Sequence, residues 1–275
     1  MTPVTAFALR SCAFLILLLT TVTVGAAEEQ VGETSPSASL GVLLSYGSVD
    51  GFAQTPAGGN PGSSSSCRPT LDELGIDRAA FYDVLAGLRW RRWGFYLGYQ
   101  AIDLSGQAVL SQSLTSRNVT FPAGTSMSSD IRFNLLRVGA GWKFGLAGGR
   151  LELFPIGEVG VLDFSYDLSG GGEMVARDYA KGYLGFGLAG RYHINHRISA
   201  ILNAQASVPI SNTPQIAVLT GGFEFDLLPA SRDARPSVFL GGGAQQIEYE
   251  DNQELPNHFN VDLGPFVTAG LSVSF

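Results

Sequence analysis

The sequence predicts an all-β fold: an antiparallel up-and-down transmembrane β-barrel of about ten strands, with eight as the alternative count. The first observation is the segment 258–275, where every second residue from Phe259 to Phe275 is apolar, the period of a strand. It is longer than the roughly 9–11 residues with which a tilted strand crosses a bilayer. The second is composition, with 15% charged residues and 35 glycines in 275 residues. The third is that, after residue 27, no apolar run approaches the roughly 20 residues of a spanning helix. The 45% of hydrophobic residues must therefore sit in alternating strands.

The first 27 residues have the organisation of a secretory signal. Arg10 is the single early positive charge, an apolar core runs from Cys12 to Leu19, and either Val24-Gly25-Ala26 or Gly25-Ala26-Ala27 supplies a small-residue cleavage site. An N-terminal membrane anchor is the alternative. The mature chain, 28–275, then forms one barrel domain. Its only cysteine is Cys67, so we expect neither an internal disulfide nor a cysteine-based zinc site.

The first half of the mature chain begins with a short alternating strand at 40–46 and a long segment, 49–80, that we expect to be an external loop. Within this loop Thr70 and Glu73 have the spacing of a capping box, and Gly75 is a helix stop, so one helical turn is expected there. Four further strands are predicted in this half. Their approximate ranges are 82–90, 93–99, 130–144 and 151–166.

Two of these strands contain a slip in the alternation. In the strand at 130–144 it falls at Leu135–Leu136, and in the strand at 151–166 it falls near Val161–Leu162. An extra residue in one strand of a pair changes which face the following side chains occupy. We therefore interpret both slips as β-bulges.

The second half completes ten strands, and the even number places both chain ends on one side. Short connections alternate with longer ones, and in outer-membrane barrels the short turns are periplasmic. The segment 238–250 is rich in glycine and its facing is ambiguous, so eight strands remain possible. The expected strands are 180–192, 198–208, 217–227, 238–250 and 258–275, and the short turns are 91–92, 145–150, 194–197 and 229–235.

Alternation alone does not say which face is outside. A soluble lipocalin-like barrel would place the apolar face inside, around a ligand, whereas a membrane barrel turns it towards lipid. Aromatic residues on the apolar face gather near the short turns, as an aromatic girdle at a membrane interface requires. These observations favour the membrane barrel. The aromatic residues are Trp90, Trp93, Trp142, Phe144, Tyr192, Phe225 and Phe275.

An alternating last strand that ends on Phe275 resembles the C-terminal signal of bacterial outer-membrane β-barrels, and the chain as a whole is similar to the OmpA-like and porin-like class. The resemblance implies location in the bacterial outer membrane and a role of Phe275 as an assembly signal. It also implies outer-membrane lipid and the barrel assembly machinery as partners. We expect a monomer. A net charge of −7 gives no support for nucleic-acid binding.

In a membrane barrel the polar face lines the lumen, and here it carries charges of both signs. Charges in a confined interior must be paired or hydrated. They form either an ion-pair plug or a charged constriction that selects solutes. We favour a mostly occluded lumen with a structural or surface role or slow passage of small solutes; an open porin is the alternative. The expected lumen charges are Arg89, Arg91, Arg137, Lys143, Glu152, Glu158, Arg191, Glu224, Asp226 and Asp262.

Evidence for an enzyme is weak in the sequence. His258 near the outer end of the last strand is similar to the histidine of outer-membrane lipid A deacylases, but Asn260 stands where that family has serine. The Asp-His couple of the omptin proteases has no counterpart. We therefore expect no catalytic residue, no cofactor and no metal, with an outer-membrane hydrolase as a further alternative.

Overall fold

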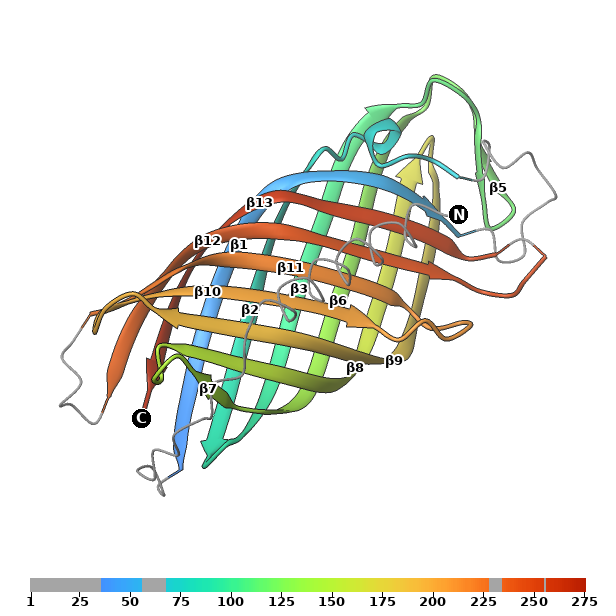
Figure 1. Ribbon diagram of the computed structural model, residues 1–275. Helices are drawn as coiled ribbons and strands as arrows, with labels where there is room; N and C mark the ends of the chain where they lie inside the picture. Colours follow the sequence, from blue (N-terminus) through green and yellow to red (C-terminus); the bar gives the residue numbers. More distant parts are fainter. Residues whose placement is uncertain (1–35, 56–67, 228–233, 255) are drawn as a thin grey trace.

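The computed structural model describes residues 36–55, 68–227, 234–254 and 256–275, which form a closed antiparallel barrel of ten long strands (Figure 1). Closure comes from pairing of the first strand with the last, with Ser39 opposite Ser274. The predicted fold and strand count are confirmed, whereas the signal at 1–27 and Cys67 lie outside the described residues. The barrel strands are β1 (Ser37–Gln54), β2 (Arg78–Trp90), β3 (Trp93–Val109), β6 (Ser126–Trp142), β8 (Leu151–Gly170), β9 (Glu173–His193), β10 (Ile198–Ser207), β11 (Gln215–Asp226), β12 (Arg235–Glu250) and β13 (His258–Ser274).

Small elements decorate the two ends. The two longest connections, 55–77 and 110–125, lie at the end opposite to the start of β1, so we name the end where β1 begins and β13 ends the periplasmic end. Here β7 (Phe144–Leu146) extends the sheet beside β8. At the opposite, external end are the hairpin of β4 (Leu114–Ser116) with β5 (Val119–Phe121) and the short helix η1 (Asp72–Leu74). The capping box is confirmed, because the backbone N–H of Glu73 donates to Thr70 Oγ1 and the backbone N–H of Thr70 donates to Glu73 Oε2.

A belt of apolar side chains faces outward around the periplasmic part of the barrel. At its periplasmic edge Trp90, Trp93 and Trp142 lie at paired positions on three neighbouring strands, and at its other edge Tyr46, Tyr82 and Tyr99 are exposed. The described residues contain no helix of the length and hydropathy that a membrane crossing requires. The exposed belt residues include Leu40, Leu44, Leu88, Leu97, Val138, Val159, Leu184, Phe223, Leu240 and Leu271.

On the external side of this belt, the apolar residues of the strands lie on the inward face instead of the outward face. In β6, Val138 and Leu136 point outward and are about half exposed, whereas Leu135, Phe133 and Ile131 point inward and are fully buried. The register of β6 with both neighbours runs without a shift through Leu135–Leu136, and that of β8 does the same through Val161–Leu162. The two predicted bulges are therefore wrong.

The physical reason for the inversion is a change of solvent along the strand. Where the outward face leaves lipid it becomes polar, as in the exposed pair of Arg132 with Asp103. At the same level the inward face becomes apolar. Two adjacent apolar residues are therefore what a regular strand needs at the membrane surface, because one faces lipid and the next faces the core.

The last strand achieves the same inversion with a bulge. Gly264 and Pro265 of β13 lie where the registers with β1 and β12 both shift, between Gly47 and Val49 and between Gly243 and Gln245. Gly264 has φ +120°, a conformation that suits glycine. The expectation of one continuous lipid face along 259–275 is therefore wrong. Inward are Phe259, Val261, Leu263 and Phe266, and outward are Val267, Leu271 and Phe275.

Candidate functional site

The barrel interior is the candidate site, and its side chains form three layers. The periplasmic layer contains two ion pairs. Lys143 Nζ lies 2.9 Å from Glu152 Oε1, and Arg191 Nη2 lies 2.7 Å from Glu224 Oε2. Ser237 Oγ also donates to Glu224, at 2.8 Å. The structure thus joins four of the charges that the sequence placed in the lumen.

A central polar layer crosses the bore. Arg137 of β6 pairs with Asp83 of β2 at 2.9 Å, and both side chains are about 90% buried. Gln100 of β3 donates to Asp83 and exchanges hydrogen bonds of 3.1 and 2.9 Å with Gln245 of β12. In the sheet, β3 and β12 are separated by β2, β1 and β13. The hydrogen bonds between Gln100 and Gln245 therefore connect two separate parts of the barrel wall through the interior. In the same layer the Tyr96 hydroxyl donates to Glu158.

Four members of this layer were missed at the level of sequence: Asp83, Gln100, Gln245 and Tyr96. The sequence does contain a signal for Asp83. It lies an even number of residues from Arg89, so both belong to the same face of the strand, and it stands between the lipid-facing Tyr82 and Val84. Gln100 follows the lipid-facing Tyr99 in the same way. Tyr96 gives no such signal, because an inward tyrosine and an interfacial tyrosine look alike in a sequence.

The external layer is apolar and aromatic. Phe133 of β6, Phe164 of β8 and Phe259 of β13 are each about 1% exposed or less, with ring centroids 4.8–5.3 Å apart. Tyr249 of β12 lies 5.8 Å from Phe259 and 5.4 Å from Tyr179 of β9. Rings from separate parts of the wall therefore meet inside the barrel. Leu71, Leu74 and Ile76, beside and within η1, are buried with them.

The remaining predicted lumen charges are distributed differently. Arg89 lies exposed at the periplasmic rim, and Asp226 lines a pocket there. Arg91 is not in the lumen, because it forms the β2–β3 turn with φ 58° and its guanidinium lies 5.2 Å from the centre of the Trp90 ring. Asp262 is also outside the lumen, facing outward opposite Asp50 and Gln246. The bulge at Gly264–Pro265 places it there.

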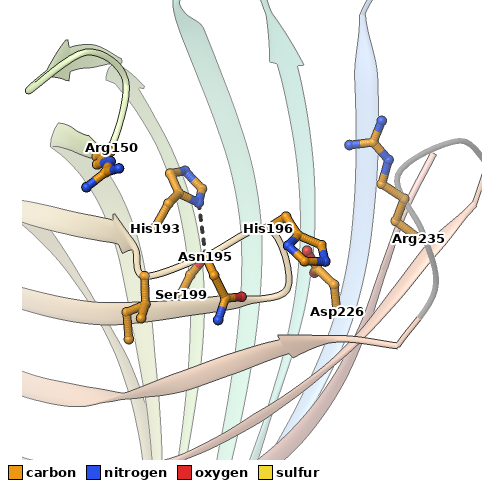
Figure 2. Close-up of a pocket in the computed structure, with 8 residues that line it drawn as sticks. Arg150, His193, Asn195, His196, Ser199, Asp226 and Arg235 are labelled. Carbon is orange, nitrogen blue, oxygen red and sulfur yellow. Dashed lines mark hydrogen bonds between the residues drawn. The ribbon is translucent and has the colours of Figure 1, made fainter.

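The pocket at the periplasmic mouth is a cavity of about 410 Å³. Figure 2 shows Arg150 and Arg235 on opposite sides of His193 and His196. The pocket residues come from the turn before β8, the β9–β10 connection and the facing ends of β11 and β12. The lining residues are Arg150, His193, Ile194, Asn195, His196, Ser199, Asp226 and Arg235.

One side of the pocket holds a serine, a histidine and a carboxylate in series. Ser199 Oγ lies 3.1 Å from His193 Nδ1, and His193 Nε2 lies 3.8 Å from Glu152 Oε1. This order of groups is that of a nucleophile, a base and an orienting acid. The geometry departs from an efficient triad in two respects, since Ser199 is 7% exposed and Glu152 is also bound by Lys143.

His258, the histidine considered at the sequence level, lies at the external end. Its Nδ1 is 3.3 Å from Arg68 Nη2, its Nε2 is 3.8 Å from Glu248 Oε1, and its ring packs edge-on against Phe52. No hydroxyl is hydrogen-bonded to it among the described residues. Within the same residues, no group of three or more His, Cys, Asp and Glu side chains is arranged to hold a metal ion.

Charge is distributed unequally between the two ends of the barrel. Cationic side chains predominate around the periplasmic mouth, and acidic ones predominate on the external portions of the strands. The cationic residues are Arg89, Arg91, Arg92, Lys143, Arg150, Arg191, Arg197 and Arg235, against Glu152, Glu224 and Asp226. The external acids include Asp50, Asp103, Asp130, Asp163, Asp167, Glu173, Asp178, Glu248, Glu250 and Asp262.

The closed barrel, its exposed apolar belt and the tryptophan positions at the belt's edge define an integral β-barrel protein of the bacterial outer membrane. No protein-family model matches the sequence, and no curated protein sequence matches it. Among solved structures, the chain is similar to the outer membrane protein OprG from Pseudomonas aeruginosa, with 11% identity, coverage of 90% of this chain and 99% of that one, and a TM-score of 0.37. It is also similar to the translocator domain of the autotransporter NalP from Neisseria meningitidis, with 10% identity, coverage of 98% and 99%, and a TM-score of 0.40.

A third similar structure is Ail of Yersinia pestis in complex with the heparin analogue sucrose octasulfate, with 8% identity, coverage of 86% and 99%, and a TM-score of 0.35. Similarities of this size carry no argument about function. The class therefore rests on the belt, the aromatic edge and the closure of the barrel.

The periplasmic ion pairs should affect stability without controlling the bore. Replacing Glu224 with Ala leaves Arg191 without its carboxylate. Because Arg191 is about one third exposed and water can solvate it, we expect a loss of about 1–2 kcal/mol in the free energy of unfolding. The aromatic layer lies beyond this pair, so conductance should not rise. Urea titration of the refolded protein tests the expected loss of stability, and planar-bilayer recording tests the unchanged conductance. Glu173→Ala, at the external start of β9, is the control. Steady conductance of the Glu224→Ala protein would contradict the expectation that the periplasmic ion pairs do not control the bore.

Proposed function

We propose that the protein is a closed outer-membrane barrel that holds a rigid folded extension at the cell surface, with a structural or surface-adhesive role and at most slow passage of small solutes. The observation that carries the proposal is the aromatic cluster of Phe133, Phe164 and Phe259 inside the external half. An apolar, close-packed interior has no room for a continuous column of water.

The length of the strands supports the surface role. β8 and β9 have 20 and 21 residues, about twice what a membrane crossing needs. Their external portions are polar outside and apolar inside, which is the pattern of a water-soluble barrel. Such an extension presents a fixed surface, because its core removes the freedom that a loop would retain. We further propose that it works as a monomer, with lipid and the assembly machinery as its general partners.

Planar-bilayer recording on the refolded full chain tests the proposal. The expected result is silence, or rare small openings without a steady level. Steady conductance at the nanosiemens level would overturn it and favour an open porin. Heat-modifiable electrophoretic mobility of the same preparation establishes that the recorded protein is folded.

A hydrolase is the second candidate function, and the Ser199–His193–Glu152 series favours it. If Ser199 is a nucleophile, a fluorophosphonate probe should label the refolded protein, and Ser199→Ala and His193→Gln should each abolish labelling. The external His258→Gln variant is the control and should label normally. An unlabelled wild-type protein removes this candidate and leaves the closed-barrel proposal untouched.

A further inference from the structure

We propose that the periplasmic pocket lined by the turn before β8, the β9–β10 connection and the facing ends of β11 and β12 binds a phosphate group, carried either by a soluble periplasmic molecule or by a phospholipid headgroup. This goes beyond the closed-barrel role, since a barrel that conducts nothing can still hold a ligand at its mouth. The inference rests on the kinds of polar atom that converge on the cavity and on their state of pairing.

The pocket is rich in donors and poor in acceptors. Arg150 and Arg235 supply guanidinium groups from opposite sides (Figure 2). No carboxylate among the described residues forms an ion pair with either of them. Asp226 is the single acid among the described residues that line the pocket, so these residues together carry net positive charge at neutral pH. Guanidinium groups match the oxygens of phosphate and carboxylate in planar pairs.

The Asn195 side chain is fixed so that it presents a donor. Its Oδ1 accepts hydrogen bonds from the backbone N–H groups of Arg197 and Ile198, at 2.8 and 2.9 Å. The oxygen is therefore occupied within the β9–β10 turn, and the Nδ2 amide is the part of the side chain left for a ligand. Because the turn holds this amide in place, little conformational freedom would be lost on binding.

Phosphate fits this donor set better than a carboxylate does. The donors come from three separate segments of the chain, and a tetrahedral phosphate has oxygens in three or four directions, whereas a carboxylate has two in one plane. The imidazole rings of His193 and His196 also line the pocket. The surrounding mouth is itself cationic, which raises the local concentration of anions. A volume of about 410 Å³ admits a phosphate together with a small group attached to it.

The test uses the full refolded chain in nanodiscs of zwitterionic lipid, titrated calorimetrically with inorganic phosphate, glycerol phosphate and acetate. We expect saturable phosphate binding with Kd below about 10 mM and weaker binding of acetate. Arg150→Gln and Arg235→Gln should each weaken phosphate binding about tenfold. Arg91→Gln is the matched control, because it removes the same charge from the same rim outside the pocket, and it should change Kd by less than about twofold.

A second readout reports on the pocket directly. The side-chain amide resonance of Asn195 should shift on phosphate addition in the wild-type protein, and Arg150→Gln should need about tenfold more phosphate for the same shift. Nanodiscs that contain phosphatidylglycerol separate the two sources of phosphate. Weaker apparent binding of inorganic phosphate in these discs indicates a lipid headgroup, and unchanged binding indicates a soluble ligand. No saturable binding, or equal weakening by all three arginine variants, would overturn the proposal.

Discussion

Replacing Phe164 and Phe259 together with Ser should turn a silent barrel into a conducting one. These rings stack with centroids 4.8 Å apart and come from β8 and β13, on separate parts of the wall. Alanine alone would leave an apolar cavity, and such cavities stay dry. Serine supplies polar groups that admit water. Planar-bilayer recording should therefore show steady openings in the double variant and none in the wild type.

The single variant Phe164→Ala measures what the same cluster contributes to stability. Truncating a fully buried Phe costs about 3–5 kcal/mol, through lost contacts and the cavity that remains. The control is Phe223→Ala, whose ring is 48% exposed towards lipid, where lipid chains fill the vacated space. We expect Phe223→Ala to lower the free energy of unfolding by less than about half as much as Phe164→Ala does. Urea unfolding of both variants decides this, and equal losses would show that the external layer is not tightly packed.

If the double-serine variant folds but does not conduct, the aromatic rings are not the barrier to ion flow. The central polar layer is then the next candidate, and it consists of Asp83, Arg137, Gln100 and Gln245. Glu224→Ala serves as the companion control, since it changes the interior at the periplasmic end and leaves the aromatic rings intact. The two variants together separate a barrier made of rings from one made of ion pairs.

Deleting Phe275 should sharply reduce insertion into the outer membrane. Its backbone N–H donates to the Ala38 carbonyl at 2.8 Å, and its own carbonyl accepts from the Ala38 N–H at 3.2 Å. Deletion therefore removes the last pair of hydrogen bonds that closes β13 on β1. Its side chain is 64% exposed on the lipid side. Unpaired backbone groups in lipid cost several kcal/mol each.

Two substitutions separate the backbone contribution from that of the side chain. Phe275→Asp keeps the backbone hydrogen bonds but places a charge at the membrane interface, and Phe275→Tyr keeps both the bonds and an aromatic ring. We expect membrane yields of heat-modifiable protein in the order wild type, Tyr, Asp, deletion, with Tyr close to wild type. A normal yield of the truncated protein would contradict a role of Phe275 in assembly.

The residues of the periplasmic ion pairs were predictable, but their pairing and the central network were only partly so. Lys143, Arg191 and their acidic partners Glu152 and Glu224 stand on the polar face of strands whose other face is apolar, and this alternation can be read within each strand alone. Asp83 stands on such a face too. The contact between Gln100 and Gln245 joins residues 145 positions apart, so no local pattern encodes it.

The sequence by itself determined the class of fold: ten alternating segments, an apolar lipid face, an aromatic edge and a last strand that ends on Phe275. These features are local, because each depends on the period of a single strand. Only the tertiary structure decided where each strand leaves the membrane, since the same two apolar residues at Leu135–Leu136 fit a bulge or a change of solvent. Closure of the barrel settles this, because it makes the inward face of every strand part of one shared core. It also places Asp262 outside, through an extra residue at Gly264–Pro265 whose effect on facing appears only when the neighbouring strands are paired with it.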